Sequence, residues 1–163
     1  MDRDRLKLHL LRHADAGDPA AWTRSDAERP LSNKGRRQAE LLGRFLASGG
    51  FRTDAVVTSP KARAAETAEL VAAELVTPVL VDDRLAVDFG PEELSAILAD
   101  AGDPIRPVLV GHDPDLSALA SWLTGTEITM KKGAMLRIDL VGPPGPGQGQ
   151  LRWLLPPDLL AVD

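Results

Sequence analysis

Three short, almost purely apolar segments constrain the fold of this chain more than any other feature of its sequence. They are AVVTS (55–59), PVLV (78–81) and PVLVG (107–111), and each is bounded by polar, glycine or proline residues. Runs of this length are typical of strands that are covered on both faces, as in a parallel sheet. A further strand is expected at LKLHLL (6–11). Because stretches with helical periodicity separate these strands, the sequence predicts an α/β fold.

Four helices are expected after these strands. Each begins with a residue that commonly caps or opens helices and stops near glycine or before the next strand. In the second helix Ser59 is the expected N-cap and Pro60 the first helical residue, and in the fourth helix Asp113 is the expected N-cap. The four helices cover residues 32–50, 59–75, 90–102 and 113–125.

Two alternating segments near the C-terminus predict a β-hairpin. AMLRIDL (134–140) and LRWLL (151–155) have the period of strands, and the Gly- and Pro-rich stretch 142–150 suits an exposed loop between them. The expected architecture is therefore a three-layer α/β/α sandwich with a mostly parallel central sheet and an antiparallel C-terminal hairpin. A length of 163 residues suits a single domain over 1–163.

Composition argues against several classes of function. The formal net charge of −5 opposes binding to nucleic acid, and the lack of cysteine excludes disulfides and thiolate chemistry. The N-terminal segment MDRDRLKLHLLRH is too charged for a signal peptide or a membrane span, so we expect a cytoplasmic protein without a membrane partner. The aspartates match no calcium loop and the histidines no zinc motif, so no metal and no cofactor are expected.

Basic residues gather where the expected strands end. Arg12 and His13 follow the first strand, Ser59 and Arg63 follow the second, and His112 follows the fourth. In open parallel sheets the ligand binds beyond the carboxyl ends of the strands, where helix N-termini also point. Two arginines that meet there would suit an anion with several oxygen atoms, above all phosphate.

The other basic residues are not expected to take part in this chemistry. His9 lies within a strand and is expected to be structural, and the two lysines before the fifth strand are expected to increase solubility. These residues are His9, Arg36, Arg37, Lys131 and Lys132.

Four segments between residues 8 and 125 resemble the histidine phosphatase superfamily, and in particular the small SixA-like phosphohistidine phosphatases. The motifs are R-H-A, L-S-x-x-G-x-x-Q-A, S-P-x-x-R-A-x-x-T and V-x-V-G-H. They occur in LLRHADAG, RPLSNKGRRQAELLG, VVTSPKARAAETAEL and VLVGHDPDLSALASWLTG.

The resemblance implies a catalytic role for four of the residues at the strand ends. It makes His13 a nucleophile that forms a phosphohistidine intermediate, Arg12 and Arg63 a phosphate clamp, and His112 the second histidine of the pocket. Ser59 and Asp113 are expected to line the same phosphate pocket. Neutral imidazole is a competent nucleophile when a hydrogen bond fixes its tautomer. Guanidinium and imidazole N–H groups can stabilise the charge on a transferred phosphoryl group without a metal.

The sequence leaves open which acid protonates the leaving group. Asp88 matches the family's position best, and Glu92, Asp113 and Asp15 are the other candidates. The expected substrate is phosphohistidine in a protein, because the leaving nitrogen of a phosphoramidate departs more easily than an alkoxide. A phosphomonoesterase for a sugar or nucleotide phosphate and a non-catalytic phosphate-binding module are the alternatives. The short chain argues against a mutase.

Overall fold

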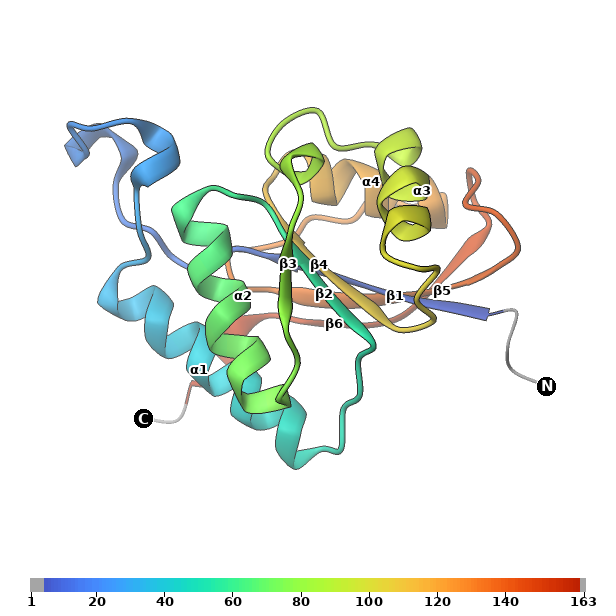
Figure 1. Cartoon of the computed structure of the whole chain (residues 1–163), viewed down its shortest axis with the longest axis horizontal. Helices are drawn as coiled ribbons and strands as arrows, with labels where there is room; N and C mark the ends of the chain where they lie inside the picture. Colours follow the sequence, from blue (N-terminus) through green and yellow to red (C-terminus); the bar gives the residue numbers. More distant parts are fainter. Residues whose placement is uncertain (1–4, 162–163) are drawn as a thin grey trace.

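The computed structural model describes residues 5–161 and contains a six-stranded sheet with two helices on each face (Figure 1). Residues 1–4, part of the N-terminal segment in which we expect no signal peptide, and residues 162–163 lie outside this range. The strand order is β3-β2-β4-β1-β5-β6. The strands are β1 (Arg5–Arg12), β2 (Ala55–Thr58), β3 (Val79–Val81), β4 (Pro107–Gly111), β5 (Met135–Val141) and β6 (Gly149–Leu155).

The sheet is parallel from β3 to β1 and antiparallel from β1 to β6. This confirms the predicted mostly parallel sheet with an antiparallel C-terminal hairpin. In the ladder Arg12 lies opposite Gly111 in β4, and Thr58 lies opposite Val110. The carboxyl ends of β1, β2 and β4 therefore reach the same edge of the sheet within one residue of each other.

Two helices pack on each face and give the expected three layers (Figure 1). α1 (Asn33–Ser48) and α2 (Ala62–Leu75) cover one face, with Leu42 and Val71 in the buried cluster. α3 (Pro91–Asp100) and α4 (Asp115–Thr124) cover the other. A fully buried Leu or Val side chain contributes about 1.5–3 kcal/mol to folding, so the two clusters hold the sheet in place. Within residues 5–161, none of the helices has the length and hydropathy needed to cross a bilayer.

The start of α2 differs from the sequence prediction. The helix begins at Ala62 with Lys61 in the N-cap position, so both lie two residues later than the predicted Pro60 and Ser59. Ser59 instead prolongs the strand, because its backbone N–H donates to the Val110 carbonyl over 3.0 Å. Its side chain is thereby kept at the edge of the sheet, beside the end of β4.

The start of α4 is also later than predicted, since the helix begins at Asp115 and Pro114 takes the N-cap position. Asp113 still binds this helix from just outside it. Its carboxylate accepts hydrogen bonds from the backbone N–H and the hydroxyl of Ser117, at 3.0 and 2.6 Å. The N-cap assignment was wrong by one residue, whereas the expected contact between Asp113 and the helix is present.

Candidate active site

The structure brings the predicted strand-end residues together at the carboxyl edge of the sheet. His13 follows β1, Ser59 follows β2, Arg63 lies in the first turn of α2, and His112 follows β4. All four side chains are buried, with exposed fractions of 8% or less. Charged and titratable groups are seldom buried without partners, so this cluster is a candidate site.

The His13 imidazole has a fixed tautomer. Its Nδ1 lies 2.7 Å from the carbonyl oxygen of Ala14, which can only accept, so Nδ1 carries the proton and Nε2 keeps its lone pair. Burial lowers the pKa of His13 to about 4, although the hydrogen bond to the Ala14 carbonyl acts to raise it. The charges of Arg63, Arg12 and Lys132 lower this pKa further. His13 is therefore a neutral imidazole with a free Nε2 at neutral pH.

His112 faces His13, with 5.2 Å between the ring centroids. Its Nε2 lies 2.8 Å from the Ser59 hydroxyl, which also accepts the backbone N–H of Lys61 over 3.2 Å. Burial lowers the pKa of His112 to about 3, and the charge of Arg63 acts in the same direction. This second imidazole is also neutral, and a serine on the neighbouring strand holds it in place.

Both arginines are anchored from outside the pocket. Nη1 of Arg12 donates to the Met130 carbonyl over 2.8 Å and lies 3.6 Å from Oδ2 of Asp113. Nη1 and Nη2 of Arg63 donate to the backbone carbonyl and Oδ2 of Asp26, at 2.9 and 3.0 Å. Burial alone would raise the pKa of Asp26, but Arg63 lowers it below its usual value. The terminal nitrogens thus hold the two guanidinium groups in fixed orientations.

Three buried nitrogen atoms of this cluster have no hydrogen-bond partner within residues 5–161. They are Nε of Arg12, Nε of Arg63 and Nδ1 of His112. Leaving such a group buried and unpaired costs about 1–3 kcal/mol, and groups of this kind in a native structure need an explanation. The His112 ring faces His13, and both guanidinium charges lower the pKa of His13. The arrangement suits an anion whose several oxygens lie close to Nε2 of His13.

Comparison with known proteins places this cluster in a family. The model of the histidine phosphatase superfamily (branch 1) matches residues 8–97, a range that holds His13 and Arg63. The chain belongs to the histidine phosphatase superfamily. An uncharacterized protein of Picosynechococcus sp. is 33% identical over 141 residues, which cover 80% of this chain and 83% of that protein.

Other relatives show the range of activities near this chain. The 8-oxo-(d)GTP phosphatase of Mycolicibacterium smegmatis is 29% identical over 124 residues, 73% of this chain but 38% of the longer relative. The structure of the protein histidine phosphatase SixA complexed with tungstate superposes with a TM-score of 0.80 and 26% identity, over 96% of this chain and all of the other. A mycobacterial glucosyl-3-phosphoglycerate phosphatase shares the fold, with a TM-score of 0.69, 17% identity, and coverage of 91% of this chain and 97% of that one.

Two of the four candidate acids are held by serine residues. Oδ2 of Asp15 accepts the Ser32 hydroxyl over 2.6 Å at the start of α1, and this bond lowers the pKa of Asp15. Both carboxylate oxygens of Asp113 bind Ser117, and one of them lies near Arg12. These carboxylates therefore stabilise the backbone around the histidine phosphatase pocket.

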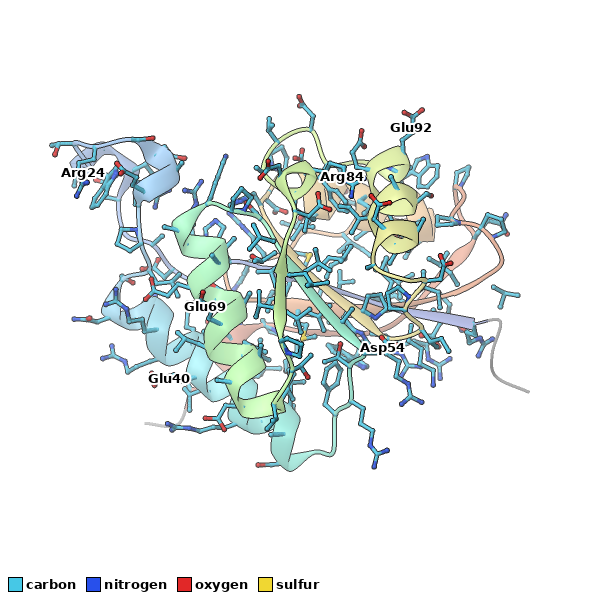
Figure 2. The ribbon with its side chains drawn as sticks, viewed as in Figure 1. Arg24, Glu40, Asp54, Glu69, Arg84 and Glu92 are labelled. Atoms are coloured by element: carbon cyan, nitrogen blue, oxygen red, sulfur yellow. The ribbon has the colours of Figure 1, made fainter. Side chains whose placement is uncertain are left out.

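The other two acids are exposed. Glu92 projects outward from the first turn of α3 (Figure 2). Asp88 lies in the segment before α3, is exposed, and makes no hydrogen bond or ion pair with another described residue. Within the same residues, no three His, Cys, Asp or Glu side chains are placed to hold a metal ion. Asp88 and Glu92 thus differ from Asp15 and Asp113 in having carboxylates that no other described residue engages.

Sequence reasoning missed several residues that shape the pocket. Asp26 begins a short 3-10 helix (Asp26–Glu28) in the segment between β1 and α1, whose path cannot be derived from local pattern. Lys132, expected to be only solubilising, lies near enough to His13 to lower its pKa. Thr67 is the last residue of the S-P-x-x-R-A-x-x-T motif, and this motif was the sequence signal that could have identified it. Its hydroxyl accepts the Ala14 N–H over 3.1 Å and donates to the Arg63 carbonyl over 2.7 Å.

Proposed function

We propose that this chain is a phosphatase that forms a phosphohistidine intermediate on His13 and acts on phosphohistidine in a protein. The observation that carries the proposal is the set of three unpartnered nitrogens around an imidazole with a free Nε2. Guanidinium and imidazole N–H groups in a buried pocket bind phosphoryl oxygens strongly and need little rearrangement.

The proposed reaction has two steps. Nε2 of His13 attacks phosphorus, the bond from phosphorus to the leaving nitrogen or oxygen breaks, and the leaving group keeps that electron pair and takes up a proton. Water then attacks the phosphorus of phospho-His13, loses a proton, and releases inorganic phosphate and the free imidazole. Arg12 and Arg63 stabilise the negative charge on the equatorial oxygens in both steps.

His112 acts as a neutral donor to the phosphoryl group in this mechanism. The Ser59 oxygen accepts the Lys61 N–H, and we assign its own hydrogen to the bond with Nε2 of His112. A neutral His112 that accepts at Nε2 carries its proton on Nδ1, the atom without a partner. Ser59 is therefore a positioning residue, although we expected it to contact phosphate directly.

A phosphohistidine substrate is favoured by the state of the candidate acids. Asp15 and Asp113 are engaged elsewhere, so protonation of a leaving group rests on Asp88. The leaving nitrogen of a phosphoramidate needs less proton donation than a leaving alkoxide oxygen. A site with few unengaged acids therefore suits a phosphoramidate substrate. The similarity to the protein histidine phosphatase SixA over almost the whole chain supports the same conclusion.

A second candidate is hydrolysis of a small phosphate ester. It is supported by the 8-oxo-(d)GTP phosphatase among the relatives and by the glucosyl-3-phosphoglycerate phosphatase that shares the fold. For an ester, we propose that Asp88 supplies the proton to the leaving oxygen. A metal is not needed in either case, because two guanidinium groups supply the positive charge.

A trapping experiment tests the nucleophile. The protein is incubated with 32P-labelled phosphoramidate and quenched in alkali, where phosphohistidine survives. We expect an acid-labile label on the wild type and none on His13→Ala, while His9→Gln serves as the control histidine and keeps the label. An unlabelled wild type would refute catalysis and leave a phosphate-binding module, and a labelled His13→Ala would refute the assignment of the nucleophile.

A turnover comparison tests the substrate class. Rates are measured with EDTA on a phosphorylated histidine phosphotransfer domain and on a panel of sugar and nucleotide phosphates. We expect faster turnover of the phosphoprotein, and loss of ester hydrolysis but not of phosphoramidate hydrolysis in Asp88→Asn. Glu92→Gln removes a nearby exposed acid and is the matched control. Faster ester turnover would favour the second candidate, and loss of activity in EDTA would contradict the metal-free mechanism.

A further inference from the structure

The amino end of the parallel strands holds a second concentration of basic side chains, at the opposite edge of the sheet from His13. A hollow of about 240 Å³ opens there between the segment after α1 and the start of β4. Asp54, labelled in Figure 2, marks this end of β2. We call the hollow the basal pocket, and its lining side chains are Lys7, His9, Phe51, Arg52, Arg106 and Arg137.

Basic side chains predominate in the lining of the basal pocket. Asp139, which is 4% exposed, accepts two hydrogen bonds from Arg137, at 2.7 and 2.9 Å. The side chains of Arg52 and Arg106 are exposed, and neither makes a hydrogen bond or an ion pair with another described residue. Arg52 and Arg106 thus place two cationic side chains beside a small hollow in a chain whose net charge is −5. Such a local field attracts anions even though the average field of the protein repels them.

The backbone around the basal pocket is firmly held. The Asp54 carboxylate accepts the backbone N–H groups of Ile105 and Arg106, at 2.7 and 2.8 Å, and the Thr53 hydroxyl donates to the Arg106 carbonyl over 2.7 Å. These bonds tie the segment before β2 to the segment before β4. The two arginines that flank the hollow, at 52 and 106, therefore extend from a rigid base, which reduces the entropy lost on binding.

The floor of the basal pocket is an aromatic pair. His9 is 3% exposed, and its Nδ1 donates to the Pro107 carbonyl over 3.0 Å. Its ring meets Phe51 edge to face, with 4.8 Å between centroids. His9 Nε2 has no hydrogen-bond partner within the described residues. The floor is thus fixed in shape and in contact with the cationic rim.

We propose that the basal pocket binds a small polyvalent oxyanion of the phosphate or pyrophosphate class, held by Arg52 and Arg106 above the His9 and Phe51 rings. The volume lies below the roughly 300–1,000 Å³ of pockets for drug-sized ligands, which favours an ion of this size. Guanidinium groups are the preferred partners of such oxygens. Four steps along the strand, about 13 Å, separate His9 at the floor of the basal pocket from His13, so this site is distinct from the carboxyl-edge cluster.

Calorimetry with inorganic pyrophosphate at low ionic strength tests the proposal in the Arg63→Ala background, where the carboxyl-edge site has lost one of the two arginines of its clamp. We expect one site in this background, and a loss of affinity of about tenfold or more when Arg52→Gln and Arg106→Gln are added. Arg37→Gln with Arg44→Gln removes the same charge from the exposed surface of α1 and is the matched control. The proposal is overturned if Arg52→Gln with Arg106→Gln binds as tightly, or if the control weakens binding equally.

Imidazole NMR gives an independent readout, because the chain has three histidines. Pyrophosphate should shift the His9 resonances in the Arg63→Ala protein, and this shift should be absent after Arg52→Gln and Arg106→Gln. Shifts confined to His13 and His112 would overturn the basal site. Neither result depends on whether His13 is a nucleophile, so failure of the proposed phosphatase activity would be distinguishable from failure of this proposal.

Discussion

Lowering the pH from 8 to 5 should strongly destabilise this protein through its three buried histidines. Burial lowers the pKa values of His9, His13 and His112 from 6.5 to about 4, about 4 and about 3. Each imidazole is neutral in the folded state, whereas each binds a proton near pH 6.5 when the chain is unfolded. The unfolded state therefore binds more protons, and the free energy of unfolding falls as the pH falls through 6.5 toward the folded pKa values.

The size of the effect is clearest for His9, which lies apart from the other two. A group with a pKa of 6.5 in the unfolded chain and about 4 in the folded chain loses about 2 kcal/mol of stability between pH 8 and pH 5. His13 and His112 interact with each other and contribute a further loss of the same sign. Domains of this size have about 5–15 kcal/mol of total stability, so the loss should be a large part of it.

Urea unfolding at pH 8 and pH 5 measures the effect, with the wild type compared with His9→Gln. The glutamine side chain can still donate to the Pro107 carbonyl but does not titrate. We expect the decrease in unfolding free energy between the two pH values to be smaller in the variant by about 2 kcal/mol. If wild type and variant lose the same amount, His9 is not held neutral by burial and the reasoning fails.

Three further substitutions test the construction of the site. Ser59→Ala should lower kcat by about ten- to a hundredfold, because His112 stays but loses its orientation. This loss is smaller than that expected from removing a donor to the phosphoryl group, and Ser59→Thr should restore activity. Asp26→Asn should tighten inhibition by inorganic phosphate about fivefold at low salt, because a negative charge beside Arg63 is removed; weaker binding would contradict this. Thr67→Val should lower the unfolding free energy by about 1–3 kcal/mol in urea, because a buried backbone N–H loses its acceptor, and Thr67→Ser should not.

Much of the fold could be predicted because local pattern determines the type of each element. Apolar runs at 55–59 and 107–111 became β2 and β4, and the Gly- and Pro-rich stretch 142–150 joins the two hairpin strands as expected. The order of strands in the sheet could not be read from local pattern, because it depends on which edges pair across the core. The starts of α2 and α4 were placed too early, because Ser59 is held at the sheet edge by its bond to Val110 and Asp113 binds α4 from one residue before the N-cap.

The candidate site likewise contains residues that could be located from the sequence and residues that could not. His13, Arg63 and His112 could be located from sequence because a parallel sheet brings its strand ends together whatever the connecting loops do. Asp26 could not, because it reaches Arg63 from 37 residues away through a loop without periodic pattern. The position of Lys132 near His13 likewise depends on how the chain returns to the pocket from α4.

The register that places Arg12 opposite Gly111 determines which parts of such a protein can vary in sequence. The two histidines that follow these residues are spaced by backbone hydrogen bonds between neighbouring strands, so their separation is set independently of every connecting loop. Exchanging a connecting loop would leave the distance between the two imidazoles the same, whereas exchanging the segment 17–30 would also remove Asp26, which anchors Arg63. The spacing of the two histidines and the anchoring of Arg63 are thereby set in different parts of the chain, and one can be altered without rebuilding the other.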